Sequence, residues 1–143
     1  MGSLKAVILA AGEGIRLRPF TMSRPKAMIP IGNKPVLEHI VHSLVANGIS
    51  DIVIVVGYFE NTIMSHFGDG RNFGAKITYV SQSRPIGTAH AVFSAWDILK
   101  DEDKVIVLAG DNFIDKNTVA SALNGEPPLA VVTESVMPSK YGV

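Results

Sequence analysis

Two glycines and four positively charged side chains lie close together between residues 9 and 26. Gly12 and Gly14 lack a Cβ, so the backbone N–H groups beside them can approach an oxyanion closely. Arg16 and Lys26 add fixed positive charge, which neutralises the charge of a phosphate ester. A surface turn with solvated arginines would explain the glycines, but not Arg16 and Lys26 beside them. The segment therefore predicts a site that holds a nucleoside triphosphate.

An uninterrupted apolar run, residues 4–9, comes directly before this loop. Such a run is typical of a strand that is covered on both faces, as in a parallel sheet between helices. Further strands are expected at residues 51–57, 76–80, 105–109 and 129–133, and helices at 35–47, 59–67, 87–99 and 118–123. This alternation predicts an α/β fold. The helical spacing at residues 87–99 predicts that Trp96 belongs to the core.

Asp111 follows the expected strand at residues 105–109. The carboxyl ends of parallel strands are where open α/β sheets bind ligands. Proteins hold Mg²⁺ with one or two carboxylates together with substrate phosphates, so Asp111 is the candidate ligand for this ion. The alternative is an aspartate that caps the following turn. The two helical histidines His39 and His42 lack a third ligand, and no metal site is predicted there.

The composition limits the partners and the compartment. The 13 basic and 13 acidic residues balance, which argues against a nucleic-acid or membrane-surface partner. The absence of cysteine excludes disulfides and thiolate zinc sites. The longest apolar runs, residues 52–56 and 105–109, are far shorter than a membrane helix. With no signal peptide in front of the first strand, a soluble cytoplasmic protein is expected. Residues 1–3 are interpreted as a cloning remnant.

Two common phosphate loops do not match the segment at residues 9–26. The dinucleotide fingerprint requires a third glycine and an immediate helix, which Pro19 and Pro25 forbid. The loop with Gly-Lys-Ser/Thr is absent as well. A dinucleotide-binding oxidoreductase is therefore disfavoured.

Ordered motifs cover nearly the whole chain, at residues 9–21, 25–26, 30, 35, 68–70, 73–74, 79–89, 110–112 and 141–143. In type and spacing they resemble those of the sugar-phosphate nucleotidylyltransferases, which include glucose-1-phosphate thymidylyltransferases and UDP-sugar pyrophosphorylases. The resemblance implies a Rossmann-like three-layer sandwich with a mainly parallel sheet. It makes residues 4–143 the nucleotide-binding N-terminal part of a nucleotidyltransferase domain that is truncated at its carboxyl end.

The resemblance also implies roles for individual residues. The nucleotide-binding residues would be Leu9, Ala10, Ala11, Gly12, Gly14, Gln82, Pro85, Gly87 and Thr88. Gln82 would read the edge of a uracil or thymine, and Gly87 would let base and ribose pack on the backbone. The catalytic residues would be Arg16, at the β and γ phosphates, and Lys26, at the α-phosphate. Asp111 would bind Mg²⁺ and Gly142 would contact the sugar. Ile15 departs from the family, which usually has threonine or serine there.

The implied reaction joins a nucleoside triphosphate, with UTP or dTTP favoured, to a sugar 1-phosphate, and it releases pyrophosphate. The second metal-binding aspartate and the acidic sugar-binding residue of the family normally lie beyond residue 143, so the chain alone is expected to be inactive. The alternative is a regulatory relative that binds nucleotide or sugar phosphate without transferring anything. Assembly into a homo-oligomer is left open.

Overall fold

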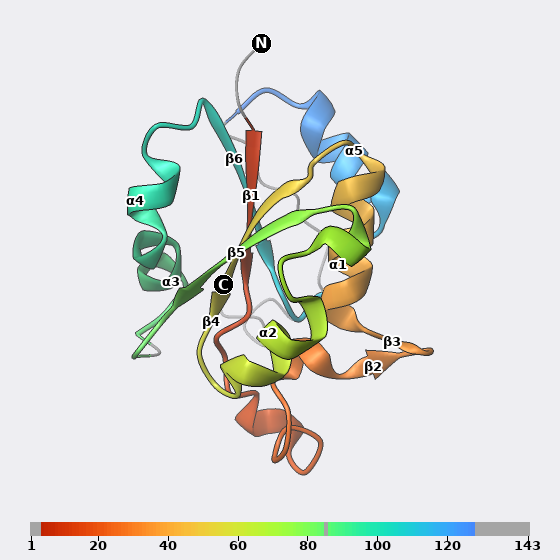
Figure 1. The fold of residues 1–143 in the computed structure, drawn as a ribbon, viewed down its shortest axis with the longest axis vertical. Helices are drawn as coiled ribbons and strands as arrows, with labels where there is room; N and C mark the ends of the chain where they lie inside the picture. The colour runs from red at the N-terminus through yellow and green to blue at the C-terminus, as the bar shows by residue number, and fades with distance from the viewer. Residues whose placement is uncertain (1–3, 85, 128–143) are drawn as a thin grey trace, which may run out of the picture.

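A computed structural model describes residues 4–84 and 86–127. Its centre is a four-stranded sheet in the order β5-β4-β1-β6, in which every neighbouring pair is parallel (Figure 1). The strands are β1 (Leu4–Leu9), β4 (Asp51–Val56), β5 (Lys76–Ser81) and β6 (Lys104–Ala109). The predicted parallel sheet is confirmed, and so are these four strand positions to within one residue at either end.

Helices cover both faces of the sheet and make three layers (Figure 1). One face carries α1 (Val36–Ala46), α2 (Glu60–Phe67) and α5 (Lys116–Asn124), and the other carries α3 (Thr88–Ser94) and α4 (Trp96–Leu99). Alternate residues of β1 point to opposite faces of the sheet. Ile8 packs with the α1 layer, and Val7 packs with the α3 layer. Both side chains are fully buried, which explains the uninterrupted apolar run of this strand.

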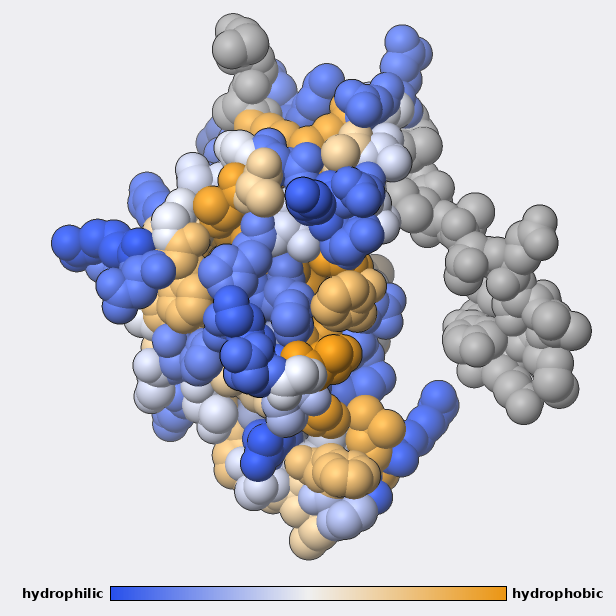
Figure 2. Space-filling model, turned by 90° about the vertical axis from the view of Figure 1, so that its right-hand side faces the viewer, coloured by the Kyte–Doolittle hydropathy of each residue, from blue (hydrophilic) through white to orange (hydrophobic). Residues whose placement is uncertain are grey.

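Short elements connect the sheet to its helices. They are the antiparallel pair β2 (Pro30–Ile31) and β3 (Lys34–Pro35) and the 3-10 turns η1 (Ile15–Leu17), η2 (Lys26–Met28) and η3 (Arg71–Phe73). Figure 2, which faces the α1 and α5 side, shows apolar surface in its lower half, towards the loop between β1 and α1. Several large apolar side chains of that loop are exposed, among them Ile15, Phe20 and Met22.

The predicted helix at residues 87–99 is two helices, and the prediction that Trp96 belongs to the core is wrong. Trp96 is 55% exposed and stacks on Phe93 at the surface, with ring centroids 6.5 Å apart. The buried positions are instead Ala91, Ala95 and Leu99, which recur every four residues. Small alanines let the helices approach the sheet closely, and this contact turns the aromatic pair outwards.

Three sequence predictions fall on residues outside the described part of the chain: the strand at residues 129–133, Pro85 and Gly142. Within residues 4–84 and 86–127, no helix is long and apolar enough to cross a membrane.

Candidate active site

A cavity of about 310 Å³ opens at the carboxyl end of the sheet. Its wall consists of Leu9, Ala10, Ala11, Gly12, Lys26, Ala27, Gln82, Gly87, Thr88, Ala91, Ala109, Gly110 and Asp111. The last residues of β1 and β6 and the loops after β1, β5 and β6 supply most of these residues, and η2 and α3 supply the others. Most of the side chains are small, so the wall exposes much backbone, as the binding of a phosphate by N–H groups requires.

Backbone hydrogen bonds bring the loops together beyond the strand ends. The Ala10 N–H donates to the Val55 carbonyl, and the Gly110 N–H donates to the Leu9 carbonyl, each at 2.8 Å. A Cβ at Gly110 would lie 2.7 Å from the Leu9 oxygen, a contact that no side chain tolerates. Gly110 therefore lets the loop that carries Asp111 approach the glycine loop.

Buried polar contacts fold the glycine loop back onto Lys26. The fully buried Thr21 donates from Oγ1 to the Gly14 carbonyl at 2.7 Å, and the Tyr58 hydroxyl donates to the Thr21 carbonyl at 3.1 Å. Gly14 adopts a left-handed φ of 64°, and a Cβ there would lie 2.9 Å from the Cβ of Lys26. The loop thus packs directly against the stem of the Lys26 side chain.

The two glycines of this loop have different surroundings. Gly14 does not line the cavity, and packing against Lys26 explains why residue 14 is glycine. Gly12 does line the cavity, and a Cβ built there would meet no protein atom within 4 Å. Close approach of a ligand to the backbone is therefore possible at Gly12, where no neighbouring side chain occupies the space.

Lys26 and Asp111 form an ion pair on the cavity wall, with Nζ 2.5 Å from Oδ2. They lie 85 residues apart, in η2 and in the loop after β6, and both side chains are about one third exposed. The pair offers the cavity one ammonium group, which can hold a phosphate oxygen, and one carboxylate, which can hold a cation. Each group neutralises the other until such partners bind.

Gln82 and His90 form a second polar pair at this cavity. Gln82 is 8% exposed, and its amide nitrogen donates to Nδ1 of His90 at 2.9 Å. His90 stands on α3 behind the glutamine and does not itself line the cavity.

The structure brings nine predicted site residues to one cavity: Leu9, Ala10, Ala11, Gly12, Lys26, Gln82, Gly87, Thr88 and Asp111. It does not bring Arg16 there, because Arg16 is exposed in η1, outside the cavity wall. Sequence reasoning missed the lining residues Ala27, Ala91, Ala109 and Gly110. Gly110 could have been predicted to line the cavity, because it directly precedes Asp111. The three alanines could not, because an alanine side chain has no group that indicates a function.

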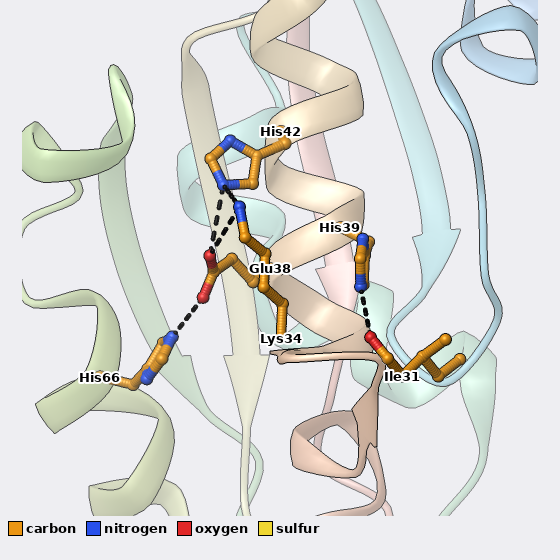
Figure 3. Close-up of polar contacts among 6 residues, drawn as sticks. All are labelled: Ile31, Lys34, Glu38, His39, His42 and His66. Atoms are coloured by element: carbon orange, nitrogen blue, oxygen red, sulfur yellow. Dashed lines mark hydrogen bonds and ion pairs between the residues drawn. The ribbon is translucent and has the colours of Figure 1, made fainter.

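Three of the histidines lie on the α1 and α2 side, and none of them lines the cavity (Figure 3). Glu38 joins two of them: its carboxylate contacts Nε2 of His66 at 2.8 Å and Nε2 of His42 at 3.3 Å. Burial raises the pKa of Glu38, but hydrogen bonds from His66 and His42 and the nearby positive charges outweigh it, and its pKa lies below the ordinary value. His39 instead contacts the Ile31 carbonyl at 3.0 Å.

Asp111 is the acidic side chain of the cavity wall. In the described part of the chain, no group of three histidine, cysteine, aspartate or glutamate residues is arranged to hold a metal ion. A single wall carboxylate suits Mg²⁺, which takes few protein ligands and completes its coordination with water and substrate phosphates.

The parallel sheet, the glycine loop and the cavity at the strand ends are features of nucleotide-binding α/β domains. The family model for nucleotidyl transferases matches residues 5–143. Across 145 residues the chain is 41% identical to a glucose-1-phosphate thymidylyltransferase of Streptomyces antibioticus, covering 98% of this chain and 40% of that protein. It is 37% identical over 146 residues to a mannose-1-phosphate guanyltransferase of Neurospora crassa, with the same two coverages.

A solved chain from Bacillus anthracis, named as a glucose-1-phosphate thymidylyltransferase, has the same fold, with a TM-score of 0.77 and 32% identity. The match covers 85% of this chain and 51% of that one. The chain therefore belongs to the nucleotidyl transferase family. It spans less than half of the length of the curated relatives that it matches, from 31% to 46%.

Proposed function

We propose that the protein transfers a nucleotidyl group from UTP or dTTP to a sugar 1-phosphate, and that this chain supplies the nucleotide half of the site. The observation that carries the proposal is the Lys26–Asp111 pair beside Gly12 on one cavity wall. A cation, a carboxylate and an open stretch of backbone are what a triphosphate with its metal ion needs. The names of the relatives agree on the reaction class, although they differ in base and sugar.

In this reaction a phosphate oxygen of the sugar 1-phosphate attacks the α-phosphorus, and the bond to the bridging oxygen of the β-phosphate breaks. The attacking phosphate is already ionised at neutral pH, so catalysis depends on positioning and on neutralisation of charge. Lys26 neutralises charge at the α-phosphate. Arg16, which is exposed on η1, would hold the β and γ phosphates, because its planar guanidinium suits bidentate phosphate contacts. Mg²⁺ held by Asp111 would supply further positive charge to the phosphates.

Pyrophosphate release by the full-length protein tests this proposal. Each nucleoside triphosphate is supplied with Mg²⁺ and a panel of sugar 1-phosphates. Lys26→Met keeps the length of the side chain and removes its charge, and should lower kcat by about 10²- to 10³-fold, as loss of one preorganised donor does. The matched control is Lys100→Met, since Lys100 pairs with Asp97 on α4 and does not line the cavity.

An unchanged rate in Lys26→Met would contradict the assignment of this lysine. The second candidate function is a regulatory relative that binds nucleotide or sugar phosphate without transfer. Nucleotide binding by the wild-type protein without pyrophosphate release would favour that candidate.

A further inference from the structure

Tyr58, the second residue after β4, contacts the glycine loop on both sides of its two glycines. Its N–H donates to the Ala11 carbonyl at 3.4 Å, and its hydroxyl donates to the Thr21 carbonyl at 3.1 Å. A backbone carbonyl can only accept, so the direction of both hydrogen bonds is fixed. The tyrosine follows a strand that is buried from Ile52 to Val56. The loop is therefore anchored to the central sheet at two points.

Thr21 extends this anchor to Gly14. The threonine is fully buried, and its Oγ1 donates to the Gly14 carbonyl at 2.7 Å. A Cβ built on Gly14 would lie 2.9 Å from Cγ2 of Thr21 and 2.9 Å from Cβ of Lys26. Gly14 is thus packed closely against both side chains, and a shift of Gly14 would change the packing around the stem of Lys26.

The position of the Lys26 ammonium group depends on this packing. The residues that follow Lys26 in η2, Ala27 and Met28, are buried, so the core holds the backbone there. The Lys26 side chain is partly exposed, and its long stem has many conformations unless a neighbour restrains it. The ion pair with Asp111 orients Nζ only until a ligand engages either partner. Packing against Gly14 restrains the stem in either case.

We propose that Thr21 and Tyr58 are positioning residues for the transfer step, which hold Lys26 in place through Gly14. This inference rests on the proposed function, because it takes the Lys26 ammonium group to neutralise charge at the α-phosphate. Neither Thr21 nor Tyr58 lines the cavity, so both would act without touching the ligand. Neutralisation of charge in a transition state requires fixed geometry, and a displacement of about 1 Å can cost about 10²-fold in rate.

The experiment measures kcat by pyrophosphate release in the full-length protein, with the nucleoside triphosphate and sugar 1-phosphate that the wild type turns over fastest. Thr21→Val keeps nearly the shape of the side chain and removes the donor to Gly14. The Gly14 carbonyl still accepts from the Leu17 N–H at 2.9 Å, so it keeps a partner. Thr21→Val should lower kcat by about 5- to 10-fold, the effect of one hydrogen bond. Thr21→Ser keeps the hydroxyl and should retain most of the rate.

Tyr58→Phe tests the outer hydroxyl of the same anchor. It should lower kcat by about 2- to 5-fold, because it acts on Gly14 only through Thr21. Tyr79→Phe is the matched control, since the Tyr79 hydroxyl also donates to a backbone carbonyl, that of Gly68 at 2.7 Å, but does not line the cavity. The control should leave kcat unchanged. Tyr58→Phe carries the test alone if Thr21→Val does not fold, as judged by its thermal unfolding midpoint.

A double-mutant cycle with Lys26→Met distinguishes positioning from a general loss of stability. If the two hydroxyls act through Lys26, their removal has no ammonium group to misplace in the Lys26→Met background. Thr21→Val and Tyr58→Phe should then change kcat by less than about 2-fold in that background, because residues that act as a unit are not additive. A merely structural role would lower kcat by the same factor in both backgrounds.

The outcomes separate this inference from the proposed function. If the wild-type protein turns over no nucleoside triphosphate, or if Lys26→Met keeps the wild-type rate, the proposed role of Lys26 fails and the inference fails with it. If Lys26→Met is slow but Thr21→Val and Tyr58→Phe keep the wild-type kcat, or lower kcat equally in both backgrounds, only the positioning role is overturned. An equal loss of kcat in Tyr79→Phe overturns it too.

Discussion

Replacing Gly12 by alanine should separate ligand binding from folding at this cavity. The added methyl group would meet no protein atom within 4 Å, and Gly12 does not have a left-handed φ. Neither a clash nor backbone strain then acts on the folded state. The free energy of unfolding is expected to change by less than about 0.5 kcal/mol, as for an ordinary surface substitution.

The same methyl group lies on the cavity wall, where a phosphate would approach the backbone. Forcing an extra methyl into a packed contact costs about 1–3 kcal/mol. At 1.4 kcal/mol for each factor of ten, this corresponds to a dissociation constant that is roughly 5- to 150-fold larger. Titration calorimetry of the full-length protein with UTP or dTTP and Mg²⁺ measures this dissociation constant. Thermal unfolding measures the stability of the variant. Wild-type affinity in a stable Gly12→Ala variant would refute the placement of the nucleotide on this loop.

Gly14→Ala is the matched control, because this substitution should lower the stability of the fold rather than act directly on nucleotide binding. Its Cβ would lie 2.9 Å from both the Lys26 Cβ and the Thr21 Cγ2, at a left-handed φ. Left-handed backbone costs about 1–2 kcal/mol in a residue with a Cβ, and overpacking adds about 1–3 kcal/mol. The thermal midpoint should therefore fall by on the order of 10 °C. A Gly14→Ala protein as stable as wild type would contradict the packing described for the loop.

Two further variants test charged groups of the chain. Arg16→Ala should raise KM for the nucleoside triphosphate several-fold more than Arg18→Ala, because only Arg16 is proposed to hold the leaving phosphates; equal effects in steady-state kinetics would refute that role. Glu38→Gln should lower the free energy of unfolding at pH 7. Since the folded state lowers the pKa of Glu38, its contribution is complete above the ordinary value of 4.5 and disappears as pH falls below it. Urea denaturation at pH 7 and pH 3.5 should therefore give a difference from wild type that shrinks at the lower pH, and a constant difference would argue against this linkage.

Local patterns predict the sheet well because its strands are covered on both faces. Ile8 and Val7 point to opposite layers, yet both are fully buried, so the apolar run in the sequence has no polar interruption. The helix at residues 87–99 shows the limit of the same reasoning. Its apolar residues form two stripes, and periodicity does not tell which stripe meets the sheet. The alanine stripe does, because it permits a closer approach, and Trp96 is left at the surface.

The sequence pointed to residues of this cavity wall where the residue type itself indicates a chemistry. Lys26 and Asp111 are charged residues in motifs, and the structure joins them across 85 positions of sequence. Contacts between distant segments were not predictable. Gly14 lies in the predicted phosphate loop, but packing against Lys26 and Thr21, rather than the cavity, requires a glycine there. The hydrogen bond from Gln82 to His90 joins a strand end to a helix, and no sequence pattern encodes it.

The polar groups at this cavity form two pairs, and each pair comes from different elements of the fold. Lys26 and Asp111 belong to η2 and to the loop after β6, whereas Gln82 and His90 belong to the end of β5 and to α3. Within residues 4–84 and 86–127, no hydrogen bond links one pair to the other. Energetic effects of residues without shared partners usually add. A variant of Gln82 combined with one of Lys26 should therefore change nucleotide affinity and transfer rate by amounts that add.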